Sequence, residues 1–291
     1  MTPPHVEPGC AATGHPHLLA VGDLHVRHPE NADVVAGLAP RHPDDWLLVA
    51  GDVAETTDVV LATLASLADR FAQVVWTPGN HELWTHPHDP DQRRGVERYE
   101  HLVERCRELG VLTPEDEYAR WSAPEGDLLV APLFLLYDYS FRDPGTSAAQ
   151  ALSAARSARQ YLSDQFLLQP DPHPDRPAWC HDRVATTEAR LAALRAAEPT
   201  AGLVTVSHYP LAEEPTRAVA SHHLRLWCGT RLTADWHRRF AVDVAVYGHL
   251  HIPRTTRVDG VRFEEVSLGY PRERQRWGVT TYEPRVVACG R

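Results

Sequence analysis

Short apolar runs recur along the chain, and most of them stop abruptly at polar or small residues. They occupy residues 17–22, 46–50, 74–76, 128–136, 203–207 and 242–247. Runs of this length that end at turn-forming residues are typical of buried strands. We therefore predict a strand at each of them. Pro132 inside the fourth run indicates a bulge or an edge position, because proline cannot donate a hydrogen bond to a neighbouring strand.

Other segments place apolar residues at helical spacing. Residues 60–71 and 99–109 both show apolar side chains every three to four positions, which predicts amphipathic helices. The first of them stands between two predicted strands, and a strand, helix and strand in succession favour a parallel pair covered by the helix. The fold class is therefore α/β. A hairpin is expected where Asp259-Gly260 joins residues 255–258 to 261–267.

The pattern changes between residues 140 and 199. Alanine-rich segments at 148–163 and 183–197 predict helices there. We interpret 140–199 as a helical insertion or cap within a single domain that spans 17–291. Residues 1–16 are rich in proline, glycine and alanine, so we expect them to form a flexible N-terminal arm.

Composition narrows the class of protein. The hydrophobic content of 43% is enough for a substantial core. No apolar stretch approaches the length of about 18 residues that a membrane span needs, and the N-terminus lacks the pattern of a secretion signal. We therefore expect a cytoplasmic protein without a membrane partner. The five cysteines are odd in number and form no C-x-x-C pair, so we expect reduced thiols without a disulfide framework or a thiolate zinc site.

Charge excludes further functions. The net charge of −10 argues against nucleic acid as a partner, because phosphate recognition needs a basic surface. All basic residues in the count of 29 are arginine, which rules out Schiff-base chemistry and a Walker-type lysine. The segment 217–291 is richer in arginine and mildly basic, which indicates either a mixed solvated surface or a face for an anionic partner. The oligomeric state is left open.

Candidate chemistry stands at the ends of the predicted strands. Five of them are followed by residue types that bind metals or transfer protons: Asp23 and His25, Asp52, Asn80 and His81, His208, and His249 and His251. In extended backbone, residues i and i+2 point the same way, so both members of a D-x-H or H-x-H pair are expected to reach one point. Buried polar groups without partners cost about 1–3 kcal/mol each, and shared cations would satisfy them.

Seven of these residues form a plausible ligand set for two metal ions. The predicted metal ligands are Asp23, His25, Asp52, Asn80, His208, His249 and His251. Asp52 is expected to bridge two ions about 3.5–4 Å apart. Asp23, His25 and His251 complete one site, and Asn80, His208 and His249 complete the other. Oxygen and imidazole ligands without thiolate suit divalent or trivalent manganese or iron, and zinc is an alternative.

Taken in order, these residues resemble the calcineurin-like metallophosphoesterases, whose pattern is D-x-H, G-D, G-N-H-[DE], a lone H and G-H-x-H. The resemblance covers about residues 17–267. It implies a four-layer α/β/β/α sandwich and a metal-bridging hydroxide that attacks phosphorus. It also implies His81 as the catalytic residue, which protonates the leaving oxygen or stabilises the transition state. Glu82 is expected either to orient His81 or to be a solvated carboxylate or helix-start residue.

Several segments are further similar to the actinobacterial 4′-phosphopantetheinyl hydrolases, which act as acyl carrier protein phosphodiesterases. They are residues 79–85, 134–141, 178–181, 226–230, 247–256 and 259–267. The resemblance implies a holo acyl carrier protein as substrate and partner, from which the enzyme removes 4′-phosphopantetheine. Five aromatic residues either accept the pantetheine arm or belong to the core, namely Trp84, Tyr137, Tyr139, Phe141 and Trp227. Carrier proteins are typically acidic, and the candidates for docking them are Arg225, Arg254, Arg272 and Arg274.

Two other functions remain open from the sequence. A general phosphomonoesterase or a cyclic-nucleotide phosphodiesterase would use the same ligand set. A scaffold protein that has lost activity should lack ligands or the acid histidine, whereas both are present here. His222, His223 and His237 lie between the last two ligand segments, either on the substrate path or on the surface.

Overall fold

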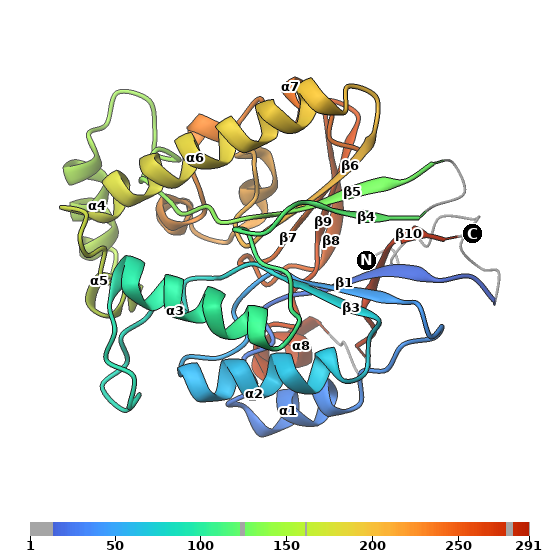
Figure 1. The fold of residues 1–291 in the computed structure, drawn as a ribbon. Helices are drawn as coiled ribbons and strands as arrows, with labels where there is room; N and C mark the ends of the chain where they lie inside the picture. The colour runs from blue at the N-terminus through green and yellow to red at the C-terminus, as the bar shows by residue number, and fades with distance from the viewer. Residues whose placement is uncertain (1–13, 123–125, 161, 278–281, 291) are drawn as a thin grey trace.

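Two β-sheets lie face to face in the computed structural model, and helices cover their outer faces (Figure 1). The structure describes residues 14–122, 126–160, 162–277 and 282–290. The order of layers is helix, sheet, sheet and helix. The expected four-layer α/β/β/α sandwich and the α/β class are thus confirmed.

The first sheet has the strand order β10-β1-β2-β3. Its strands are β1 (His17–Val21), β2 (Trp46–Val49), β3 (Gln73–Trp76) and β10 (Arg285–Cys289). The first three run parallel, and β10 pairs antiparallel with β1 at the edge. The helices α1 (Pro29–Ala36), α2 (Thr57–Ala68) and α3 (Gly95–Glu108) cover its outer face (Figure 1).

The second sheet has the order β4-β5-β6-β7-β9-β8. Its strands are β4 (Ala119–Trp121), β5 (Leu128–Leu133), β6 (Gly202–Ser207), β7 (Val244–Tyr247), β8 (Arg254–Val258) and β9 (Val261–Glu265). The four central strands are parallel and the two edge strands antiparallel. The predicted hairpin joins β8 to β9, and Asp259 and Gly260 both have positive φ, as a tight two-residue turn requires.

Alternation along each strand explains why the runs are apolar throughout. In β1, Leu18 and Ala20 pack between the sheets, whereas Leu19 and Val21 pack beneath the helices. Successive side chains of a strand point to opposite faces, and both faces here are buried. Valines of β6 and β7 fill the same layer between the sheets.

The helices between β5 and β6 differ from expectation. They are α4 (Ala148–Ser157), α5 (Asp164–Leu167) and α6 (Arg176–Ala197). The last begins well before residue 183, because Asp175 caps it by accepting a hydrogen bond from the Ala178 N–H. It packs on the outer face of the second sheet, so it is a layer of the sandwich. Figure 1 shows α4 and α5 at one end of the sheets. Whether 140–199 acts as a cap stays a prediction.

The remaining elements are three 3-10 helices, η1 (Glu214–Ala218), η2 (His222–Trp227) and η3 (Arg231–Thr233), with α7 (Trp236–Arg239) and α8 (Pro271–Trp277). A bridge between Gly22 and Ser267 connects the two sheets just beyond β1 and β9. The Gly22 N–H donates to the Val266 carbonyl at 3.0 Å, and the Leu268 N–H donates to the Gly22 carbonyl at 2.8 Å. The carboxyl end of β1 in the first sheet is therefore hydrogen-bonded to the segment after β9 of the second sheet.

Several smaller expectations can be compared with the structure. Pro132 lies inside β5, but β4 pairs only with Leu128–Val130, so Pro132 has a strand neighbour on the β6 side alone. Cys106, Cys180 and Cys228 are buried and free, whereas Cys289 is disulfide-bonded, so the expectation of five reduced thiols is wrong. No helix among the described residues has the length and apolar character to cross a membrane. Most of the predicted arm, residues 1–13, lies outside the described residues, and the cytoplasmic location stays a prediction.

Candidate metal centre

The predicted ligands come together where the strands of both sheets end. The segments that follow the carboxyl ends of β1, β2 and β3 supply some of the predicted ligands, and those that follow β6 and β7 supply the others. Asp52 lies at its centre. Its Oδ2 is 3.5 Å from His208 Nε2, 3.7 Å from His81 Nε2 and 3.9 Å from His25 Nε2. Side chains from segments far apart in the sequence thus surround one carboxylate.

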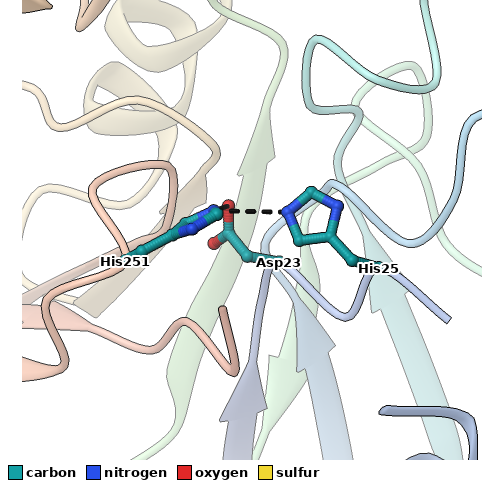
Figure 2. A group of neighbouring side chains, drawn as sticks. All are labelled: Asp23, His25 and His251. Carbon is teal, nitrogen blue, oxygen red and sulfur yellow. Dashed lines mark hydrogen bonds and ion pairs between the residues drawn. The ribbon is translucent and has the colours of Figure 1, made fainter. Parts of the chain in front are cut away.

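One part of the centre consists of Asp23, His25 and His251. Figure 2 shows the two imidazole rings on either side of the Asp23 carboxylate. His251 Nε2 lies 3.1 Å from Asp23 Oδ1 and 3.2 Å from His25 Nε2. Glu273 of α8 contacts the other ring nitrogen of His251, with its Oε2 2.7 Å from Nδ1. This contact fixes the ring with Nε2 directed at Asp23.

The other part consists of Asn80, His208 and His249. His208 Nε2 is 3.0 Å from Asn80 Oδ1 and 3.1 Å from His249 Nδ1. Its Nδ1 is 2.8 Å from the carbonyl oxygen of Ala50. A carbonyl only accepts, so the proton of neutral His208 is on Nδ1, and Nε2 presents a lone pair.

The donor set fits cations better than it fits a hydrogen-bonded core. Asn80 Nδ2 donates to Asp164 Oδ1 at 2.8 Å, which turns Asn80 Oδ1 toward His208. The lone pairs of Asn80 Oδ1, His208 Nε2 and the Asp52 carboxylate therefore face one another without a proton between them. Such an arrangement is repulsive unless a positive ion lies among them.

Three overlapping triads in the described residues have ligand atoms within 4.8 Å of one another. They are Asp23, His25 and His251; His25, Asp52 and His81; and Asp23, Asp52 and His208. Six of the eight predicted site residues are members. Asn80 and His249 contact His208 directly. The second triad includes His81, which the family resemblance predicts to be the catalytic residue and not a metal ligand.

Burial and charge move the pKa values of these groups in opposite directions. Burial lowers the pKa of His25 and of His249 well below the usual value, and neighbouring imidazoles add to the effect. Both rings are therefore neutral, as metal binding requires. Burial likewise raises the pKa of the Asp52 carboxyl. For His251, burial opposes protonation, but Asp23 and Glu273 outweigh it and raise the pKa.

The backbone of the ligand segments is left-handed. Nine non-glycine residues of the described chain have positive φ, and five of them are predicted ligands: Asp23 (50°), His25 (42°), Asp52 (54°), His249 (71°) and His251 (53°). The prediction that D-x-H and H-x-H converge through extended backbone is therefore wrong in its geometry, although the side chains do meet. Such conformations cost about 1–3 kcal/mol each and cluster at functional sites.

Two glycines leave room for the central carboxylates. A Cβ on Gly79 would lie 2.1 Å from Asp52 Oδ1, and a Cβ on Gly248 would lie 2.2 Å from Asp23 Oδ2. No real Cβ approaches an oxygen so closely. The glycines of G-N-H and G-H-x-H are thus required by the close approach of a carboxylate from another strand.

Glu82 has a role that the sequence did not indicate. Its side chain is buried and accepts hydrogen bonds from the N–H groups of Val53 (2.7 Å), Gly79 (2.8 Å) and Asp52 (3.0 Å). Burial and the charge of Asp52 raise its pKa to about 7. Glu82 therefore connects the β2 and β3 exit loops, and both earlier expectations for it are wrong.

Glu55 contacts His81 instead. Its Oε1 lies 3.4 Å from His81 Nδ1, and the His81 ring stacks on Trp84 with centroids 3.7 Å apart. Burial opposes a charge on His81, but Asp52 and Glu55 outweigh it and raise the pKa of His81. Glu55 lies in the loop after Asp52, and no spacing rule distinguishes it from other surface carboxylates.

The aromatic residues proposed to accept a substrate arm are mostly core residues. Each of Trp84, Tyr137, Tyr139, Phe141 and Trp227 is less than one-tenth exposed. The alternative that they pack inside the protein is therefore favoured.

The remaining basic candidates differ in their surroundings. His237 is buried and lies 3.0 Å from Asp259 of the hairpin, and the ring of His222 lies tilted against that of His223. Arg274 is half-buried and donates to the Asn31 side chain and to the Gly269 carbonyl. Arg272 is exposed and lies over the Tyr270 ring, which stacks on His25. Arg272 is thus an exposed docking candidate that is connected to the centre through Tyr270.

Comparison with known proteins places this fold and site in a class. A family model described as calcineurin-like phosphoesterase matches residues 16–253. The chain therefore belongs to the calcineurin-like phosphoesterase family, whose members are metal-dependent hydrolases of phosphoric esters.

Within the family, the chain is similar to a protein of Mycobacterium tuberculosis. It is 52% identical over 262 residues to the [acyl-carrier-protein] phosphodiesterase PptH of that organism. The matched region covers 90% of this chain and 80% of the relative. A crystal structure of the M. tuberculosis phosphopantetheinyl hydrolase PptH matches with a TM-score of 0.90 and 48% identity. That match covers 95% of this chain and 98% of that one.

Proposed function

We propose that this protein hydrolyses the phosphodiester that joins 4′-phosphopantetheine to the serine of a holo acyl carrier protein. The observation that carries the proposal is the identity of 52% with a phosphodiesterase of that name over nine-tenths of the chain. Water enters at phosphorus, and the bond from phosphorus to the serine oxygen breaks. The products are the apo carrier protein and free 4′-phosphopantetheine.

The centre is proposed to hold two metal ions. Asp23, His25 and His251 would bind one ion, and Asn80, His208 and His249 the other, with Asp52 between them. Manganese and iron suit these oxygen and imidazole ligands, and zinc is the alternative. When bound, the ions would supply an activated water and neutralise charge on the phosphoryl oxygens.

His81 is proposed as the catalytic residue. Burial opposes a charge on His81, but Asp52 and Glu55 outweigh it and raise its pKa, which favours the protonated imidazole. Nε2 would then donate a proton to the departing serine oxygen. Glu55 lies within ion-pair distance of Nδ1, and Trp84 supports the face of the ring. A serine alkoxide leaves poorly without a proton, so this donation belongs to the same step as the cleavage.

Mass spectrometry of the carrier protein tests the proposal. A holo acyl carrier protein is incubated with the purified protein and Mn²⁺, and a parallel sample contains excess chelator. We expect loss of the phosphopantetheine mass in the first sample only. His81→Ala should retain metal but lose this activity. Asp45→Asn is a matched control, because Asp45 is a buried carboxylate next to the start of β2, at the other end of the sheet.

Two outcomes would contradict the proposal. If the carrier protein stays intact while a generic phosphodiester is hydrolysed, the protein is a general phosphodiesterase with the same centre. If His81→Ala binds metal normally and keeps full activity, the assignment of the proton donor is wrong.

A further inference from the structure

A carboxylate from the region of α4 and α5 reaches the metal centre. Asp164 is the first residue of α5 and is fully buried. Its Oδ1 accepts two hydrogen bonds, from Asn80 Nδ2 at 2.8 Å and from Trp84 Nε1 at 2.7 Å. One oxygen atom thus contacts a proposed metal ligand and the indole that supports the proposed catalytic imidazole.

The bond to Asn80 decides which end of its amide faces the centre. With Nδ2 turned to Asp164, Asn80 Oδ1 lies 3.0 Å from His208 Nε2. The opposite rotamer would direct an NH2 group at the ligands, and an NH2 group cannot bind a cation. An acceptor on the far side of the amide favours the rotamer that binds a cation before any ion is present.

The bond to Trp84 acts on His81. The indole ring stacks on the imidazole at a centroid distance of 3.7 Å and an interplanar angle of 29°. With its N–H held by Asp164, the indole cannot rotate away from this position. The same carboxylate oxygen therefore sets the support for His81.

Asp164 is itself fixed by the chain around it. Arg176, at the start of α6, donates to the Asp164 carbonyl at 2.7 Å and to the Leu168 carbonyl at 2.9 Å. The Thr85 N–H donates to the Leu167 carbonyl at 2.9 Å, so the segment after His81 is bound to α5. Asp164 is thus held from both sides while it contacts Asn80 and Trp84.

We propose that Asp164 is a positioning residue for the metal centre, which orients the Asn80 amide toward one ion and Trp84 against His81. This inference rests on the proposed metal sites but not on the identity of the substrate. Partners that orient a metal ligand typically contribute 10–100-fold to metal affinity or activity.

A pair of near-isosteric variants tests the role of the acceptor oxygen. Asp164→Asn keeps an acceptor, because one amide oxygen can receive both hydrogen bonds, whereas Asp164→Leu has none. Mn²⁺ binding to chelator-treated protein is measured by calorimetry. We expect Asp164→Leu to weaken one of two binding events by about tenfold or more and to leave the other within about threefold. Asp164→Asn should restore the weakened event to within about threefold of wild type.

A second readout separates positioning from a structural role. Turnover of a small diester is compared at saturating Mn²⁺, where the ion sites of all variants are filled. We expect kcat of Asp164→Leu to fall about tenfold with little change in KM, and Asp164→Asn to recover it. Asp45→Leu, which removes a buried carboxylate next to the start of β2, should lower thermal stability without changing either Mn²⁺ affinity.

The outcomes are decisive for the proposal. Wild-type Mn²⁺ affinities in Asp164→Leu would overturn it, as would an Asp164→Asn variant that behaves like Asp164→Leu. If Asp164→Leu fails to fold, as judged by circular dichroism, Asp164→Ala takes its place under the same criteria. None of these measurements uses a carrier protein, so a wrong substrate would leave their result unchanged.

Discussion

Replacing Gly79 with alanine tests the geometry of the centre most directly. The substitution adds one methyl group, and Gly79 does not have a left-handed φ, so an alanine backbone is compatible with this position. The only conflict is steric. The new Cβ would lie 2.1 Å from Asp52 Oδ1 and 2.7 Å from the Asp52 nitrogen.

The size of the effect follows from these distances. Cβ atoms essentially never approach another heavy atom within 3.0 Å, so the Asp52 carboxylate must move by about 0.9 Å or more relative to Gly79. Asp52 lies between the two proposed metal ions, and a displacement near 1 Å typically costs about 100-fold in rate. We therefore expect kcat to fall about 100-fold, which corresponds to a barrier higher by about 2.7 kcal/mol.

The assay follows hydrolysis of a small diester at saturating Mn²⁺, together with bound metal measured by mass spectrometry. Gly37→Ala is the control, because a Cβ there would lie no closer than 3.4 Å to its neighbours and the φ of Gly37 is −83°. We expect Gly37→Ala to behave as wild type. If Gly79→Ala kept wild-type kcat and metal content, the position of Asp52 would not matter to the chemistry and the proposed centre would be refuted.

Four further outcomes are expected. Glu55→Gln should lower kcat on the holo carrier about tenfold but leave a nitrophenyl diester almost unaffected, because nitrophenolate departs without a proton. Chelation should abolish both activities and lower Tm, and Mn²⁺ should restore them; Tm unchanged by chelation would argue against bound ions. Arg98→Met should lower the free energy of unfolding in urea by about 3–5 kcal/mol, because Asp89, 2.8 Å away, would stay buried without its counter-charge; a loss below about 1 kcal/mol would contradict this. Burial raises the pKa of Glu115, but Arg183 and Tyr99 more than offset it, so the pKa is lowered. The stability that Glu115 supplies is therefore present above its unfolded pKa and lost as pH falls, and in urea titrations Glu115→Gln should show a shallower decline between about pH 5 and 3 than wild type.

The convergence of the predicted ligands could be foreseen because its signal in the sequence is local. Each candidate stands within five residues of the end of a buried strand, and the carboxyl ends of parallel strands meet at one edge of a sheet. The positive φ at Asp23 and His251 could not be inferred, since neither residue type requires it. The steric need for Gly79 and Gly248 likewise depends on a carboxylate from another strand.

The residues that orient the predicted ligands could not be predicted, because their contacts depend on tertiary packing. Glu55, Asp164 and Glu273 are ordinary acidic residues in the sequence, and each lies on a different loop or helix. Their contacts with His81, Asn80 and His251 depend on how these elements pack. The edge strand β4 escaped prediction because it has only three residues and mixes polar with apolar side chains. The edge strand β10 is apolar from Val286 to Cys289, so its sequence did carry the signal of a strand.

The division of the centre between two sheets has a consequence for biosynthesis. The exits of β1, β2 and β3 are translated long before those of β6 and β7, and β10 follows every other strand although it pairs with β1. A nascent chain that has exposed only its first sheet therefore carries an incomplete ligand set and an unpaired edge on β1. We therefore expect the proposed ions to bind late, on the ribosome or after release, once both halves of the centre have folded.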